Sequence, residues 1–110
     1  MNPEANRLML EVEKLRRETN RRMISAQVKQ LSMENITPLL TMVARCRSEY
    51  LQTLMDMSAE CKGNLPDEAM IERLRHRRLV YEELKTAVNA LETAVQRDYL
   101  DVENTRNRQT

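Results

Sequence analysis

The residues that interrupt helices are confined to a few places in this chain. Its 110 residues include one glycine, Gly63, and three prolines, Pro3, Pro38 and Pro66. Glycine and proline are the least favourable residues inside a helix, so long helices have room between these positions. In the intervening stretches the apolar residues recur every three or four positions, which is helical spacing and not strand spacing. The sequence therefore predicts an all-α protein made of three long helices.

The first helix is predicted over residues 3–34. Asn2 can cap the free backbone amides at its start, and Pro3 suits the first turn. A polar stretch at residues 16–22 interrupts its apolar stripe, which then resumes in a shifted position. We interpret this stretch as a solvated face, or as a turn where the partner of the helix changes. The stripe consists of Leu8, Val12, Leu15 and Thr19, followed by Ile24, Val28 and Leu31.

The second helix is predicted over residues 38–62. Proline disfavours helical geometry in the residue before it, so we expect either a turn or a kink at Thr37 and Pro38. Gly63 suits a left-handed cap at the end of the helix, and Leu65 is placed to fold back over the last turn. The apolar stripe consists of Leu39, Val43, Cys46, Tyr50, Leu54, Met57 and Cys61, and it is widened by Leu40, Leu51 and Met55.

The third helix is predicted over residues 66–103, with residues 104–110 expected to be frayed. Asp67 and Glu68 are acidic residues that suit the positive end of a helix. In its heptad pattern only Arg77 and Asp98 break the apolar a and d positions. The apolar members are Met70, Leu74, Tyr81, Leu84, Val88, Leu91, Val95 and Val102, and a flanking row consists of Val80, Ala87 and Ala94.

The short link between the second and third helices predicts that they fold back on each other. We expect an antiparallel hairpin over residues 38–104 plus the N-terminal helix, in one domain of residues 1–110. The first and third helices are longer than the second, so apolar residues are left without cover inside the chain. We therefore expect bundle or coiled-coil packing completed by oligomerisation, as a dimer or a hetero-oligomer. The predicted interface residues are Leu74, Tyr81, Leu84, Val88, Leu91 and Val95.

Nothing in the sequence indicates enzymatic chemistry. His76 is the only histidine, and no nucleophile or orienting carboxylate is apparent beside it. Cys46, Cys61 and His76 are widely spaced, whereas zinc ligands usually come in close pairs. A single glycine excludes glycine-rich phosphate loops. We expect no catalytic residue, no metal and no cofactor.

A basic cluster on the third helix is the best candidate for electrostatic recognition. It consists of Arg73, Arg75, Arg77 and Arg78. Successive residues of a helix point in different directions, so these side chains do not line one groove. The net charge is +1, and the chain has three tyrosines and no other aromatic residue, so little surface is available for stacking bases.

The sequence favours a non-enzymatic helical protein–protein interaction module, a coiled-coil subunit or adaptor of a larger assembly. One alternative is a small dedicated chaperone of the secretion-system type, which shields a partner's amphipathic helix. A second alternative is a nucleic-acid-associated protein that uses residues 73–78. No apolar run approaches the roughly 18 residues of a membrane span, and the first residues have the pattern of a helix start. We expect a cytoplasmic or nuclear protein with protein partners and no membrane partner.

Overall fold

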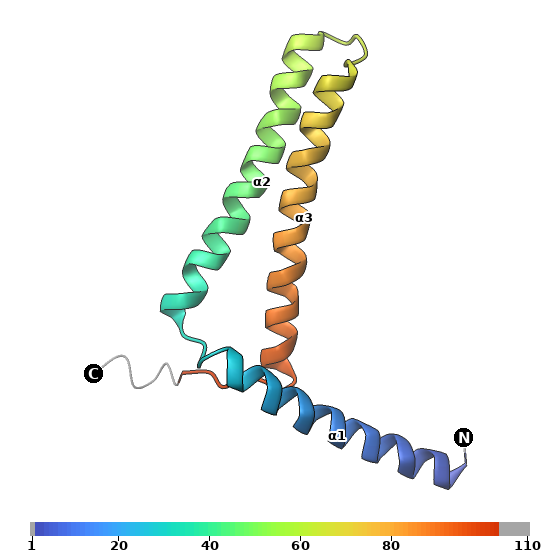
Figure 1. Ribbon diagram of the computed structural model, residues 1–110. Coiled ribbons are helices and arrows are strands. Elements are labelled where there is room, and N and C mark those ends of the chain that lie inside the picture. The colour runs from blue at the N-terminus through green and yellow to red at the C-terminus, as the bar shows by residue number, and fades with distance from the viewer. Residues whose placement is uncertain (1, 104–110) are drawn as a thin grey trace. The chain divides into compact units, whose positions relative to one another are not determined.

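The computed structural model describes residues 2–103, and three helices account for most of them (Figure 1). They are α1 (Pro3–Gln27), α2 (Met33–Cys61) and α3 (Glu68–Gln96). Within this range the only extended pairing is an isolated parallel bridge between Leu31 and Val102. The predicted all-α class with three helices is confirmed. The chain divides into two compact units: residues 36–90 form one, and the segments before and after them form the other.

α1 begins as predicted but ends earlier. The side chain of Asn2 accepts a hydrogen bond from the backbone N–H of Ala5 at 2.7 Å, and Pro3 opens the helix. The predicted end at residue 34 is wrong, because α1 stops at Gln27. Leu31 is buried, its N–H donates to the carbonyl of residue 101, and its own carbonyl accepts from the N–H of residue 103. A residue inside a helix could not make these backbone bonds.

α2 begins before Pro38, so the predicted helix start at residue 38 is also wrong. The hydroxyl of Ser32 accepts from the N–H of Asn35, and the Asn35 side chain accepts from the N–H of Ser32 at 2.8 Å. This reciprocal arrangement is a capping box with asparagine in the usual place of glutamate. Pro38 therefore lies inside α2, beyond the first turn. The strong cap upstream fixes the start of the helix and outweighs the local preference of proline.

The turn between α2 and α3 follows the sequence closely. Gly63 has φ 89°, the left-handed conformation expected of a helix-capping glycine, and Lys62 before it has φ 51°. Asp67 accepts a hydrogen bond from the N–H of Met70 at 2.8 Å and so caps α3. The predicted fold-back of Leu65 is wrong, since this side chain is 94% exposed.

α3 ends at Gln96 and not at residue 103. The N–H of Tyr99 donates to the carbonyl of Ala94 at 2.8 Å, and the N–H of Asp98 donates to the carbonyl of Val95 at 3.1 Å. Together with the positive φ of Asp98, 61°, these two bonds form a Schellman motif, which terminates a helix. The predicted fraying of residues 104–110 lies outside the described residues.

α2 and α3 lie side by side in opposite directions, which confirms the antiparallel hairpin (Figure 1). Near the turn, the Cys61 sulfur lies 3.5 Å from the sulfur of Met70. The α2 stripe was predicted almost correctly: its half-buried residues are Ile36, Leu39, Val43, Cys46, Tyr50, Thr53, Met57 and Cys61. Leu54 was placed in this stripe, but it is exposed and Thr53 takes its position. With Thr53 in place of Leu54, steps of three and four alternate from Ile36 to Met57, which keeps the row on one helical face.

Few residues are buried anywhere in the described chain. Leu31, Ala94 and Leu100 form the buried set, and all three belong to the unit built from the flanking segments. α1 and α2 contain no buried residue. The helices therefore have apolar stripes but little enclosed core.

Candidate interaction surface

Tyr81 joins α3 to α2 through both its ring and its hydroxyl. The ring stacks on that of Tyr50, with centroids 6.2 Å apart and planes inclined by 29°. The hydroxyl accepts hydrogen bonds from Nε and Nη2 of Arg47 at 2.9 and 2.6 Å. The side chains of Arg47 and Lys85 also lie over the ring, 5.2 and 5.4 Å from its centroid. Both tyrosines belong to stripes predicted from the sequence, whereas Arg47 was not predicted, because no spacing rule links it to a residue of another helix.

The other predicted interface residues share the face of Tyr81. All six are half-buried: Leu74, Tyr81, Leu84, Val88, Leu91 and Val95. Leu74, Leu84 and Val88 belong to the same unit as α2, and heptad spacing places them on the side of α3 that Tyr81 turns towards α2. Leu91 and Val95 belong to the other unit. This face of α3 therefore packs inside the chain at Tyr81, and its binding of a separate partner stays a prediction.

The basic cluster is largely paired with glutamates of the same chain. Arg77 forms an ion pair with Glu49 of α2 at 2.6 Å. The two other pairs lie within α3: Arg75 with Glu72 at 3.7 Å, and Arg78 with Glu82 at 3.4 Å. Arg73 lines a small hollow beside two acidic side chains, Asp56 and Glu60. Exposed pairs of this kind contribute little to stability, but they reduce the positive charge that the cluster presents.

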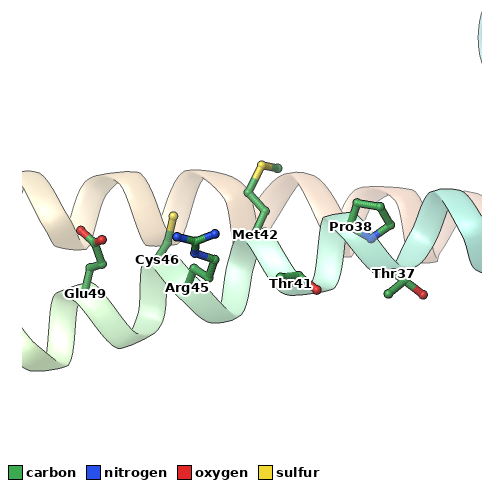
Figure 2. A pocket seen from close by; sticks show the side chains of 7 residues that line it. All are labelled: Thr37, Pro38, Thr41, Met42, Arg45, Cys46 and Glu49. Carbon is green, nitrogen blue, oxygen red and sulfur yellow. The ribbon is translucent and has the colours of Figure 1, made fainter.

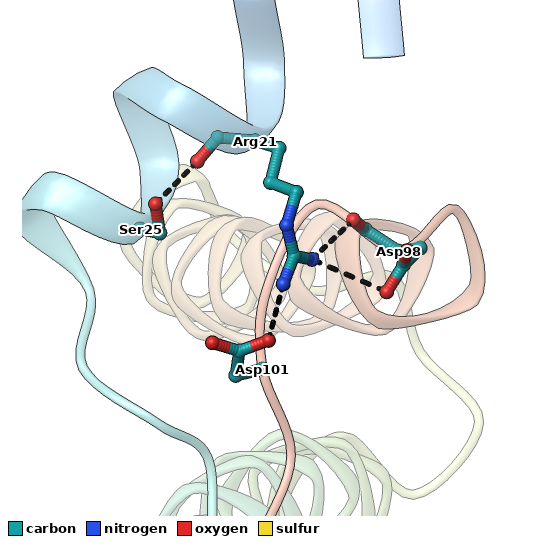
Figure 3. A network of polar contacts seen from close by, with 4 residues as sticks. All are labelled: Arg21, Ser25, Asp98 and Asp101. Carbon is teal, nitrogen blue, oxygen red and sulfur yellow. Dashed lines mark hydrogen bonds and ion pairs between the residues drawn. The ribbon is translucent and has the colours of Figure 1, made fainter. Parts of the chain in front are cut away.

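A second polar network lies in the other unit (Figure 3). Arg21 of α1 donates to the backbone carbonyl of Asp98 at 2.7 Å, and its guanidinium pairs with the carboxylates of Asp98 and Asp101. The hydrogen bond to Asp101 and the two negative charges raise the pKa of Arg21 above its usual value. Ser25 donates to the backbone carbonyl of Arg21 at 2.5 Å. The network holds the segment after α3 to α1, and the sequence showed Arg21 only as part of a polar stretch.

α2 carries a second row of side chains, all of them exposed, beside the stripe that faces α3. We call it the outer seam, and it consists of Leu40, Ala44, Arg47, Leu51, Leu54 and Ser58. The steps along it are four, three, four, three and four residues, so the row stays on one helical face. This face lies about a quarter turn from the half-buried stripe. Its leucines are exposed by 51%, 52% and 43%, and the adjacent Met55 by 62%.

A shallow hollow lies along another side of α2, near its beginning (Figure 2). Its volume is about 620 Å³, and the side chains that line it are Thr37, Pro38, Thr41, Met42, Arg45, Cys46 and Glu49. Polar groups alternate with apolar ones along it, and the hollow has room for an apolar side chain.

Between residues 2 and 103, His, Cys, Asp and Glu side chains nowhere form a group of three that could hold a metal ion. None of the helices in that range has an apolar stretch long enough to cross a bilayer. No protein-family model, curated protein or solved structure matches the chain.

Proposed function

We propose that this chain is a non-enzymatic helical protein–protein interaction module, a coiled-coil subunit or adaptor of a larger assembly. The observation that carries the proposal is the outer seam of α2. Its spacing is that of a coiled-coil seam, and its three leucines are exposed although the adjacent face of the same helix packs on α3. A helix with two apolar faces suits a bundle, in which it contacts more than one neighbouring helix.

The scarcity of buried residues supports the same function. A fully buried apolar side chain stabilises a fold by about 1.5–3 kcal/mol, and a folded domain depends on many of them. Here the described residues include three buried ones, while large apolar side chains of all three helices are exposed. Covering part of this surface with a partner's helix would add the missing stabilisation.

Neither alternative is favoured by a specific contact. A nucleic-acid-binding protein would present its arginines to phosphate, whereas Arg75, Arg77 and Arg78 pair with glutamates of the same chain. A chaperone would expose flexible methionines to clients. The exposed methionines of α2 are Met33, Met42 and Met55. Successive ones are 9 and 13 residues apart along the helix, so they do not form one continuous surface.

Affinity capture from the native source tests the proposal. The bait is the tagged chain in three forms: unchanged, with Leu51→Glu and Leu54→Glu together, and with Leu65→Glu as a control. Leu65 lies in the turn and is 94% exposed, so the control introduces a charge at an exposed leucine outside the seam. We expect the unchanged chain and the control to bind the same helical protein, or copies of the chain itself. The outer-seam variant should lose this partner and keep its helical circular dichroism spectrum.

Two results would contradict the proposal. One is that the outer-seam variant retains the same partner at the same stoichiometry. The other is that the unchanged chain binds no protein and sediments as a 13.0 kDa monomer at every concentration. Binding to nucleic acid that weakens steeply with salt would favour the basic cluster as the functional site.

A further inference from the structure

The outer seam has an order of large and small side chains that matches its own reverse. Read along α2 it runs Leu40, Ala44, Arg47, Leu51, Leu54, Ser58. When a second copy is laid against it in the opposite direction, Leu40 faces Ser58 and Ala44 faces Leu54. Arg47 then faces Leu51 at the centre. Every leucine meets a side chain of a different size, and the two pairings with Ala or Ser allow the helices to approach closely.

A parallel arrangement lacks this complementarity. With two copies in the same direction and in register, leucine faces leucine at three levels and alanine or serine faces its own kind at two. The wide and narrow levels then alternate along the interface, which leaves voids beside the small residues. Both arrangements are closed, because in each of them the two copies use the same surface and are related by a two-fold axis, so the fit of the side chains decides between them.

Arg47 is the one charged residue in the outer seam, and its head group is already held inside the chain. The guanidinium donates two hydrogen bonds to the hydroxyl of Tyr81 and lies 5.2 Å from the ring centroid. Its head is therefore directed towards α3, and the methylene groups of its stem remain for packing against a leucine. With its charged head directed towards α3, the part of the seam that a second helix would contact is mostly apolar.

We propose that the outer seam of α2 binds the outer seam of a second copy of this chain, antiparallel and about a two-fold axis. The proposal rests on the proposed function, and it names the partner and the orientation. The seam extends over about 27 Å of helix from Leu40 to Ser58 at 1.5 Å per residue. A contact of this length between single helices gives a modest interface, so the dimer should depend on protein concentration.

Disulfide crosslinking between two different single-cysteine chains tests the orientation. In a background with Cys46→Ala and Cys61→Ala, one chain carries Ala44→Cys and the other Leu54→Cys. Equal amounts are mixed and oxidised mildly. The proposal expects a disulfide-linked dimer in the mixture and none with either chain alone. In an antiparallel pair, identical positions 44 lie ten residues apart along the axis, about 15 Å, which exceeds the reach of a disulfide.

Each other outcome would overturn the proposal. Crosslinking of either chain with itself indicates a parallel pair. A dimeric mass without crosslinks in the mixture indicates that another face associates. A monomeric mass at all concentrations contradicts the self-association. Affinity capture then decides whether the proposed function is contradicted as well. If the unchanged chain captures a different helical protein and the outer-seam variant loses it, the proposed function holds and the proposal of a second copy is contradicted. If no protein is captured, both are contradicted.

Discussion

Tyr81 of α3 contacts two residues of α2, one through its ring and one through its hydroxyl. Its ring stacks on Tyr50, and its hydroxyl accepts two hydrogen bonds from Arg47. The hydroxyl and the ring therefore stabilise the hairpin through separate contacts, and a substitution can remove the hydroxyl while keeping the ring.

Tyr81→Phe should lower the free energy of unfolding by about 1 kcal/mol, because it removes the hydroxyl acceptor and retains the stacked ring. Urea denaturation followed by circular dichroism measures the change. Tyr50→Phe is the matched control, since none of the hydrogen bonds described for residues 2–103 involves the Tyr50 hydroxyl. Combining Tyr81→Phe with Arg47→Met should cost no more than the larger single change. Strict additivity would show that the two side chains do not interact.

At the scale of the helices, the sequence predicted three of the six ends to within two residues and missed the other three. The start of α2 was missed although its cap is local, because asparagine stands in the usual place of glutamate in the capping box of Ser32 and Asn35. Asn2, Gly63 and Asp67 act within a few positions of themselves, so their sequence context was sufficient. The end of α1 depends on Leu31 pairing with residues 101 and 103, which spacing along the chain does not reveal. The end of α3 depends on Asp98 adopting a positive φ, a conformation usually taken by glycine.

Pro38→Ala should stabilise the protein, because proline beyond the first turn of a helix is unfavourable and alanine is the best helix former. Alanine also gives the unfolded chain more freedom, which offsets part of the gain. We expect a net increase of about 1–2 kcal/mol in the free energy of unfolding, measured by urea denaturation.

Pro66→Ala provides the comparison for this prediction. Pro66 lies in the turn, outside the helices, so its replacement should leave stability unchanged or slightly lower. An unchanged or reduced stability of Pro38→Ala would mean that α2 does not continue through residue 38 in solution.

At the scale of the whole chain, the sequence predicted that the helices have apolar faces but not which of these faces is covered inside the chain. The heptad residues of α3 were predicted to meet a partner, and Tyr81 of that set packs on α2. Leu40, Leu51 and Met55 entered only as a widening of one stripe, although they mark a separate exposed face. A single helix does not show which of its two apolar faces is covered inside the chain. That choice depends on the register of the hairpin, and the turn at Gly63 sets it.

The contacts around that turn also imply an order of folding. Cys61 and Met70 are 9 residues apart in sequence, Arg47 and Tyr81 are 34 apart, and Arg21 and Asp98 are 77 apart. Closing the longest of these loops directly costs about 2 kcal/mol more than closing the shortest. Each contact made near the turn shortens the loop that remains, so the chain should form structure from Gly63 outwards.

Gly63→Ala should therefore slow folding, whereas Arg21→Ala should mainly speed unfolding. A side chain at position 63 meets nothing within 4 Å, so the first change acts through the positive φ alone. Stopped-flow folding and unfolding rates distinguish the two variants, and a slower folding rate for Arg21→Ala would contradict this order. A chain that folds outwards from one tight turn forms the contacts of Arg21 with Asp98 and Asp101 last, so these should be the first contacts to break when the protein is stressed.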